Sequence, residues 1–530
     1  MAALRAREKG ANVILVEKAA VQRSGSAASG LDHARGVYPV EGTGNPDDFA
    51  EAFMRQSEGM SNRKLLRIIG EEMPERMFYL EKYGLKIRDE QGRLYLQSGV
   101  GTTQSFILSF EGEDLKKRFD QALKENGITV LNRTMPTRLL MDGRRVAGAA
   151  VVNTRTAEFS TIGAKAVVLA TGGAIRIYPS MTGLPYNTVQ CPYNTGDAYA
   201  MGHQVGAEMV SFEFTQVMLT LKNYSVPGYA GAISTGARVV NALGERIMEK
   251  YHPSMLEKAP RHFVCFAVDQ EIMEGRGPCY FDFRHLPEDK LEHYRHGLKN
   301  ERAMILRYFD EKGLDLSKDL VEIEPAEIST QNGGVSGLLI DEGAATNVPG
   351  LYAAGDCAGG VGYCAGSNAM VFGWRAGASA TEYAAGTGVI PWPGDAARAE
   401  SLRALRPLGR THGPTGRELE QKVQKTMGDY VGARRNDASL RTAVRGLENL
   451  KNYLEDLRAE SAQDLLVTTE AQNGLVTGEM VAKAALTRTE SRWTHRRVDY
   501  PEQDDANWKK FLVVTGKEGR TVLYTRELPE

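Results

Sequence analysis

Two carboxylates in this chain stand where they could bind the hydroxyl groups of a sugar. Glu17 ends the apolar run NVILVE, and Asp356 follows the run GLYAAG. A carboxylate at the end of a buried strand can accept hydrogen bonds from a ribose diol, and Asp356 is placed to bind a hydroxyl of a ribityl chain. Taken singly, Glu17 could equally be a surface charge, and Asp356 could belong to a tight turn.

A third apolar run ends in glycines instead of a carboxylate. AKAVVLATGG is typical of a buried strand that runs directly into Thr171, Gly172 and Gly173, where the backbone can approach a ligand closely. Residues 1–10 have helical spacing and stop at a glycine just before the strand that ends at Glu17. A helix followed by such a strand is the second half of a dinucleotide-binding βαβ unit, so the runs predict an α/β nucleotide-binding domain.

Composition limits the class of protein. A length of 530 residues predicts two or three domains, and a net charge of -2 gives no reason to expect a nucleic-acid or membrane-surface partner. No stretch is apolar enough to insert in a membrane, and residues 1–20 are too charged for a secretory signal, so we expect a cytoplasmic protein or the soluble part of a complex. The five cysteines form no CxxC pair, which predicts neither a disulfide framework nor an iron–sulfur ligand set.

One boundary divides the chain. The stretch GTGVIPWPGDAAR at 386–398 breaks both helix and strand patterns. Glycine turns between short apolar runs precede it, as in α/β and α+β domains. After it, residues 417–435 and 439–457 have the leucine and valine spacing of helices in a bundle, and residues 509–528 predict two strands around a GKEG turn.

Longer blocks of sequence support a family resemblance. RVVNALGERIMEKYHP, KAPRHFVCFAVDQEIMEGRG, NTGDAYAMGHQVGAEM and TRTESRWTHRRVDYPEQDDANW resemble, in order and spacing, flavoprotein subunits of the succinate dehydrogenase and fumarate reductase superfamily. That superfamily includes L-aspartate oxidase and the alpha subunit of adenylylsulfate reductase. The resemblance covers essentially the whole chain. It implies an α/β fold (α+β overall), with a Rossmann-like FAD-binding domain split by a capping domain and followed by a helical domain.

The resemblance also implies domain limits. In the family, a strand and a glycine-rich loop come directly before the helix that here begins at Met1, so we expect the start codon to be placed too late or the chain to be truncated. That loop would set backbone N–H groups against the FAD pyrophosphate. The expected segments are the first part of the FAD domain at 1–211, the cap at 212–325, the second part at 326–385, a linker at 386–400, a helical domain at 401–495 and a C-terminal segment at 496–530.

The cofactor-binding residues follow from the same comparison. Succinate dehydrogenases carry a histidine that bonds covalently to the flavin, and the matching position here is Gly25, so the resemblance implies non-covalent FAD. The wording KAAVQRSGSAASG is closer to adenylylsulfate reductase. The residues expected to contact FAD are Glu17, Ser24, Gly25, Ser26, Gly30, Thr171, Gly172, Gly173, Asp197, Gly355, Asp356, Ser367 and Asn368.

The substrate side departs from the family pattern at four positions. Glu213 in FEFTQ replaces a histidine, Phe266 replaces the proton-delivering arginine, Ser329 replaces a second histidine and Cys364 replaces another arginine. A pocket without these cations would leave two carboxylates unpaired, so neither succinate nor fumarate is the expected substrate. If the alignment is shifted, Arg261 or Arg375 could serve instead.

The residues that the resemblance places around the flavin face are each weighed against a plain structural role. A low-pKa cysteine or a raised-pKa glutamate can act as acid or base, but a satisfied core residue is the commoner case. His262 and His285 are most simply hydrogen-bonded structural histidines. The run RWTHRR at 492–497 is most simply a solvated face, and the alternative is a surface that meets an acidic partner. The candidate catalytic residues are Glu213, Thr215, Lys222, Ser329 and Cys364.

The expected function is hydride transfer between a small organic substrate and FAD, with electrons exchanged with a ferredoxin-like iron–sulfur partner. One alternative is an adenylylsulfate-reductase-like alpha subunit. The other is a flavin-carrying electron-transfer subunit without a substrate of its own. This second alternative comes from a different functional class, because such a protein needs no substrate pocket.

Overall fold

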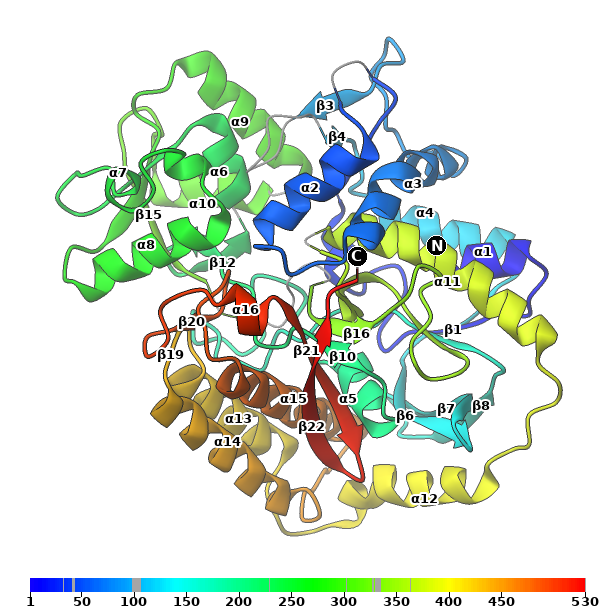
Figure 1. Ribbon diagram of the computed structural model, residues 1–530. Helices are drawn as coiled ribbons and strands as arrows, with labels where there is room; N and C mark the ends of the chain where they lie inside the picture. Colours follow the sequence, from blue (N-terminus) through cyan, green and yellow to red (C-terminus); the bar gives the residue numbers. More distant parts are fainter. Residues whose placement is uncertain are drawn as a thin grey trace.

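The computed structural model describes residues 1–31, 33–40, 43–97, 106–227, 229–301, 303–326, 328, 335–362 and 364–529. A main body with α1, α11 and the strands β1 and β6–β8 lies on the right in Figure 1, a cap at the upper left and a bundle of helices at the lower left. No helix among these residues is long and apolar enough to cross a membrane.

The main body contains the predicted nucleotide-binding strands. The predicted N-terminal helix is α1 (Ala2–Glu8), and the three apolar runs form β1 (Ile14–Val16), β9 (Val167–Leu169) and β17 (Leu351–Ala353). The strand β1 pairs in parallel with β5 (Thr129–Leu131), and β9 pairs in parallel with β17. These sequence predictions are confirmed.

The helix α11 (Ala365–Gly386) packs closely against α1. A Cβ atom at Gly377 would collide with the carbonyl oxygen of Ala2, so glycine is needed there for this approach. Between the two strand pairs the described sheet is interrupted, because β1–β5 and β9–β17 are separate two-stranded sheets.

Further elements complete the main body. They are η1 (Ser26–Ser29), β2 (His33–Arg35), α2 (Pro46–Gln56), α3 (Arg63–Glu81), β3 (Tyr95–Gln97), β4 (Ile107–Ser109), α4 (Leu115–Glu125), β6 (Thr134–Asp142), β7 (Arg145–Asn153), β8 (Phe159–Gly163), α5 (Asp197–Gln204), β10 (Met209–Val210), β16 (Gly337–Leu339), η3 (Gly355–Cys357) and β18 (Ala358–Gly359). β6–β8 form an antiparallel meander, and β2–β4–β3 a second small sheet.

The cap has an apolar core of its own. The buried members of this core lie between Val217 and Ile323, within the segment 212–325 expected to form the capping domain. Its antiparallel sheet has the order β12–β11–β15–β14–β13. Its elements are β11 (Leu219–Leu221), β12 (Tyr224–Pro227), α6 (Tyr229–Thr235), β13 (Arg238–Val240), α7 (Met248–Tyr251), η2 (Leu256–Lys258), α8 (Arg261–Met273), β14 (Cys279–Asp282), α9 (Glu288–Glu301), α10 (Ala303–Lys312) and β15 (Val321–Pro325).

The C-terminal part is largely helical, as predicted. It comprises α12 (Gly394–Leu405), η4 (Arg406–Gly409), α13 (Gly416–Tyr430), β19 (Arg434–Arg435), α14 (Asp437–Leu450), η5 (Lys451–Tyr453), α15 (Ala462–Thr487), β20 (Arg496–Arg497), α16 (Asp505–Trp508), β21 (Lys510–Lys517) and β22 (Arg520–Glu527). The predicted hairpin is confirmed in β21 and β22, which pair in antiparallel register on either side of Glu518 and Gly519.

The connection at 386–400 is shorter than expected. The helix α11 extends to Gly386 and α12 already begins at Gly394, so only 387–393 are non-helical. Pro393 precedes the first turn of α12, where a missing N–H costs nothing, and Asp395 lies in that turn beside the positive helix end.

The prediction of a solvated face at 492–497 is wrong. Arg492 and Arg497 are each 1% exposed and His495 is fully buried. Their charges are matched inside the protein, since Arg492 bonds to both oxygens of Glu490 at 2.8 and 2.9 Å and Arg497 to both oxygens of Asp499 at 2.8 and 2.7 Å.

A fully buried ion pair joins Arg488, which lies just before this segment, to Glu213 at the start of the cap. Arg488 Nε donates to Glu213 Oε1 at 2.7 Å, and its Nη1 donates to Glu490 Oε1 at 2.8 Å. Arg435 Nη1 donates to the carbonyl of Glu213 at 2.6 Å. Burial raises the pKa of Glu213, and the Arg488 charge opposes that rise. Loss of one partner therefore leaves a charge without compensation.

We predict that Arg488→Met destabilises the C-terminal part by about 3–5 kcal/mol, because it removes one partner of a buried pair. Urea unfolding followed by tryptophan fluorescence measures this, since Trp493 and Trp508 lie in the same region. Glu213→Leu combined with Arg488→Met should recover part of the loss. Lys425→Ala, which removes an exposed pair with Asp429, is the control and should leave the transition in place. A midpoint for Arg488→Met equal to that of the control would contradict this account.

Candidate active site

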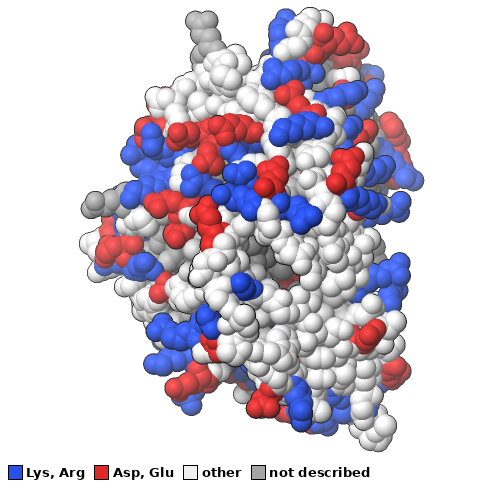
Figure 2. Space-filling model, turned by 90° about the vertical axis from the view of Figure 1, so that its right-hand side faces the viewer, with Lys and Arg blue, Asp and Glu red and all other residues white. Residues whose placement is uncertain are grey.

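A large cavity of about 2120 Å³ lies where the predicted nucleotide-binding strands end. Residues of β1 and β9 line it, together with Gly355 and Asp356 after β17. Figure 2 shows a hollow with a mostly uncharged rim on the face that carries α1 and α11. Its volume exceeds the usual range for a drug-sized ligand, about 300–1,000 Å³, so it can hold a long cofactor.

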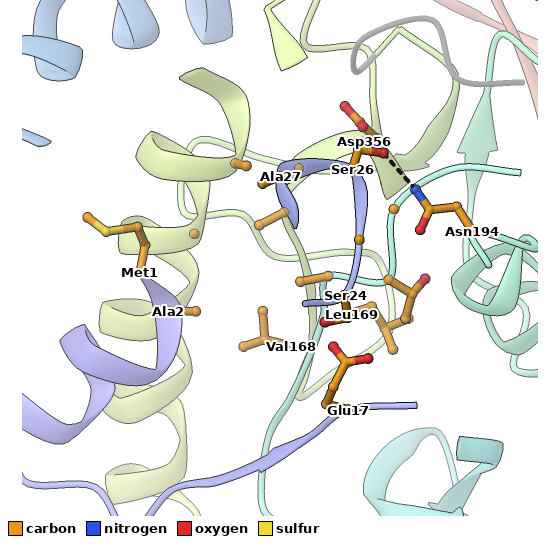
Figure 3. Close-up of a pocket in the computed structure, with 18 of the residues that line it drawn as sticks. Met1, Ala2, Glu17, Ser24, Ser26, Ala27, Val168, Leu169, Asn194 and Asp356 are labelled. Atoms are coloured by element: carbon orange, nitrogen blue, oxygen red, sulfur yellow. Dashed lines mark hydrogen bonds between the residues drawn. The ribbon is translucent and has the colours of Figure 1, made fainter. Parts of the chain in front are cut away.

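Glu17 stands at the end of β1 with its carboxylate directed into the cavity (Figure 3). One oxygen, Oε1, accepts the backbone N–H of Ala19 at 2.8 Å, which fixes the side chain. The other oxygen is able to accept a hydroxyl, as a ribose diol would require.

The loop after β1 brings backbone and hydroxyl groups to the cavity wall. Ser24 lines the cavity, and its Oγ is buried without a hydrogen-bond partner in the part of the chain that the structure describes. Gly25 has φ +71° and lines the cavity beside it, in the left-handed region that glycine adopts without strain. Asn194 Nδ2 donates to Ser26 Oγ at 3.2 Å, which ties this loop to the segment after β9 (Figure 3).

The glycines after β9 divide into two groups. Thr171 and Gly172 line the cavity, and a Cβ at Gly172, which has φ +76°, would lie 2.8 Å from Asn194 Nδ2. Gly173 is not among the lining residues, and its carbonyl accepts the N–H of Gly196. Asp197 lines the cavity, but its carboxylate is held by Lys18 at 3.1 Å and Asn473 at 2.9 Å, so it ties β1 to α15.

The turn after β17 is held from α11. Gly355 has φ +73°, and its carbonyl accepts Asn368 Nδ2 at 2.9 Å. Asn368 itself does not line the cavity, whereas Ser367 does and accepts the N–H of Arg35 at 2.8 Å. All the predicted cofactor residues other than Gly173 and Asn368 lie in the cavity wall.

These residues fit FAD. The hydroxyl of Ser24 is buried without a hydrogen-bond partner in the described residues, and a polar ligand in the cavity would supply one. Gly25, Gly172 and Gly355 allow the backbone to approach the ligand, and Glu17 presents a carboxylate to it. The groups that would hold FAD are therefore on the strand ends, as in other dinucleotide sites.

The predicted catalytic residues lie in different places. Glu213 and Thr215 are buried outside the cavity wall, Glu213 against Arg488 and Thr215 accepting Arg435 Nη2 at 2.7 Å. Lys222 is partly exposed and pairs with Glu324 at 2.5 Å. Ser329 lies outside the described residues. These assignments stay predictions, and the cavity wall gives no support to the first three.

Cys364 does line the cavity, at the N-terminus of α11. Burial raises the pKa of its thiol to about 12, against a smaller lowering by the charge of Arg35. The thiol is therefore protonated at neutral pH and cannot act as a thiolate.

The end of the cavity beneath the cap contains residues that were not among the candidate catalytic residues. Arg261 and His262, the first two residues of α8, line it together with Gln216, Trp493 and Thr494. Phe266 is not part of the wall and packs under the guanidinium of Arg496, 5.2 Å from its ring centroid. The sequence feature that could have predicted a role for His262 is its position at the start of a helix, directly after Arg261.

Comparison with known proteins agrees with this geometry. Residues 1–370 match the FAD binding domain family, and residues 420–528 match the fumarate reductase flavoprotein C-terminal family. The chain is 28% identical to an uncharacterized FAD-dependent oxidoreductase of Methanocaldococcus jannaschii, over 97% of this chain and 94% of the relative. It is 29% identical to one of the subunits of fumarate reductase (CoM/CoB) from Methanothermobacter marburgensis, over 97% and 95%.

Solved structures show the same fold. Adenylylsulfate reductase from Archaeoglobus fulgidus superposes with a TM-score of 0.89 at 23% identity, covering 100% of this chain and 93% of that one. The Escherichia coli quinol fumarate reductase FrdA E245Q variant gives a TM-score of 0.86 at 23% identity, covering 100% and 95%. The strand ends, the cavity and the two family matches together make this chain an FAD-dependent oxidoreductase of the succinate dehydrogenase and fumarate reductase flavoprotein family.

Proposed function

We propose that this flavoprotein transfers hydride between non-covalently held FAD and a small organic acid bound under the cap. The observation that carries the proposal is the continuity of one cavity from the strand ends to Arg261 and His262. When bound, FAD supplies a two-electron acceptor or donor of hydride. The chain supplies a guanidinium, an imidazole and a wall of mixed polarity for the substrate.

The small acid we propose is not a dicarboxylate. Cys364, which lines the cavity, stands where the family carries an arginine, and Glu213 and Phe266, which replace two further cations, lie outside the wall. A dicarboxylate would lack those family cations, and an unpaired buried carboxylate costs several kcal/mol.

A specific observation favours fumarate as a second candidate. One relative is named as part of a fumarate reductase (CoM/CoB), and Arg261 lines the cavity where Phe266 does not. An arginine at this place can both pair with a carboxylate and stand close to the reacting carbon. The two candidates differ in whether a dicarboxylate is turned over.

We predict no detectable succinate oxidation with an artificial electron acceptor and no fumarate reduction with reduced methyl viologen. Assays of the FAD-loaded chain in both directions measure this. Turnover that disappears in Arg261→Ala but persists in Arg375→Ala would establish fumarate chemistry. Arg375 is a suitable control because it pairs with Glu72 away from the cavity.

We predict that the purified protein releases its FAD on acid precipitation, because Gly25 offers no atom for a covalent bond to flavin. Colour that remains in the pellet would contradict this. Glu17→Ala should weaken FAD binding by about 1–3 kcal/mol, the range for a charge-assisted hydrogen bond lost from a buried site. Equilibrium dialysis measures the change, and Glu158→Ala, an exposed carboxylate outside the wall, is the control.

We further propose that one more parallel strand fits between β1 and β9. In the described residues β1 pairs with β5 and β9 with β17, while residues of both β1 and β9 line the cavity. An extension upstream of Met1 that carries a strand and a glycine-rich loop should raise FAD occupancy, because loop amides and the start of α1 would face the pyrophosphate. The flavin-to-protein absorbance ratio measures this against a polar extension of equal length. Equal ratios would contradict the proposal.

We also propose an iron–sulfur partner for the electrons. No group of side chains in the described residues could hold a metal ion, and the cysteines are dispersed. A ferredoxin-like gene beside this one would support the partner. Turnover of a small organic acid by the isolated chain with a dye would exclude the alternative of an electron-transfer protein without a substrate.

A further inference from the structure

We propose that His262 is an acid–base group of this site and that Glu58 is its positioning residue, an inference that rests on the proposed function. His262 is 2% exposed and lines the cavity beneath the cap. Its Nε2 lies 2.8 Å from Glu58 Oε1. Glu58 comes from the turn between α2 and α3, so the pair joins the cap to the main body.

The carboxylate of Glu58 is fixed from a third segment. Its second oxygen, Oε2, accepts the backbone N–H of Trp493 at 2.8 Å, and its carbonyl accepts Arg492 Nη1 at 3.2 Å. Glu58 and Trp493 both have left-handed backbones, with φ +48° and +49°. Non-glycine residues adopt this conformation only where the surroundings fix it, which is frequent at functional sites.

The pair has a defined protonation state at neutral pH. Burial would raise the pKa of Glu58, but the bonds from His262 and Trp493 lower it overall, so the carboxylate is ionised. Burial lowers the pKa of His262, and the charges of Arg496 and His252 lower it further against the opposing effect of Glu58. A neutral imidazole beside a carboxylate places its proton on the bonded nitrogen, here Nε2. Nδ1 is then the basic atom.

His495 is a buried histidine of the same protein with both ring nitrogens in hydrogen-bond contacts, and it serves as a comparison for His262. Its Nδ1 lies 2.9 Å from Arg435 Nη1 and its Nε2 lies 3.2 Å from the carbonyl of Arg488, so both nitrogens are engaged. His262 differs, because in the described part of the chain its Nδ1 has no hydrogen bond to protein. His262 therefore has one ring nitrogen that the described residues do not engage, at a position that lines the cavity.

The chemistry that this arrangement supports is proton transfer coupled to hydride transfer. When bound, FAD would supply the hydride acceptor for oxidation of the acid, and His262 Nδ1 would take the proton that the acid releases with the hydride. The resulting imidazolium is balanced by the Glu58 carboxylate through Nε2–H. In the reverse direction the imidazolium returns the proton to the substrate.

The test uses the full FAD-loaded chain with two readouts besides activity. In protein labelled with ¹⁵N-histidine, His262 should carry its proton on Nε2 at pH 7. Glu58→Gln should move the titration midpoint of His262 to lower pH, because Glu58 raises its pKa in the wild type. Diethyl pyrocarbonate, followed by peptide mass spectrometry, should modify His262 and exposed His285 but not His495.

Activity separates catalysis from structure. With crotonate and reduced methyl viologen, or butyrate and a dye, His262→Gln should lower kcat about 100-fold or more with little change in KM. Glu58→Gln should lower kcat less and move the acidic limb of the oxidation profile to lower pH, while His285→Gln should leave both unchanged.

Three results would overturn the inference: a His262 as unreactive as His495, an unshifted midpoint in Glu58→Gln, or kcat of His262→Gln within threefold of the wild type. If the chain turns over one of these acids but His262 does not react with diethyl pyrocarbonate, only this inference is overturned and the proposed function stands. A chain that holds FAD but turns over none of these acids overturns the proposed function as well.

Discussion

Buried arginines hold the C-terminal segment, and the rest of the site depends on how their charges are matched. Arg435, Arg488, Arg492 and Arg497 are each at most 1% exposed. A guanidinium can be buried only when carboxylates and carbonyls take up its donors. Glu213 and Glu490 do so for Arg488, which draws together the start of the cap and the segment after α15. The positions of these acids are therefore fixed by the arginines.

The same constraint reaches the cavity. Arg492 is held by Glu490 and donates to the carbonyl of Glu58, and the next residue, Trp493, donates its N–H to the Glu58 carboxylate. The cap has a core separate from that of the main body, so polar contacts carry much of the seam between them. The contact between His262 and Glu58 is one of these. The bond that orients the imidazole thus also helps to hold the cap over the cavity.

Sequence patterns predicted the elements whose chemistry is local. The strands before Glu17, Thr171 and Asp356 are apolar runs with a glycine or carboxylate at the end, and that pattern depends on few distant contacts. The solvated face expected at RWTHRR was wrong because segments far away in the sequence bury this run, as the bond from Arg492 to the carbonyl of Glu58 shows. The acids that pair with Arg492 and Arg497 lie only two residues away, at Glu490 and Asp499. Family positions named Glu213 and Cys364 for catalysis, but residue type could not show that, of these two, Cys364 lines the cavity and Glu213 does not. Glu213 turns instead to Arg488, and burial keeps the thiol of Cys364 protonated.

Charge at the cap end of the cavity then determines what can bind. Arg261 and Arg35 both line the cavity, the neutral His262 adds no charge, and the hydrogen bonds of Glu58 compensate its carboxylate. Guanidinium groups in the wall favour a ligand that carries a carboxylate. A proton taken up by His262 adds a positive charge, which the adjacent carboxylate of Glu58 offsets. In the function that we propose, the acid would bind and exchange its proton at the same end of the cavity, with the imidazolium of His262 paired to Glu58.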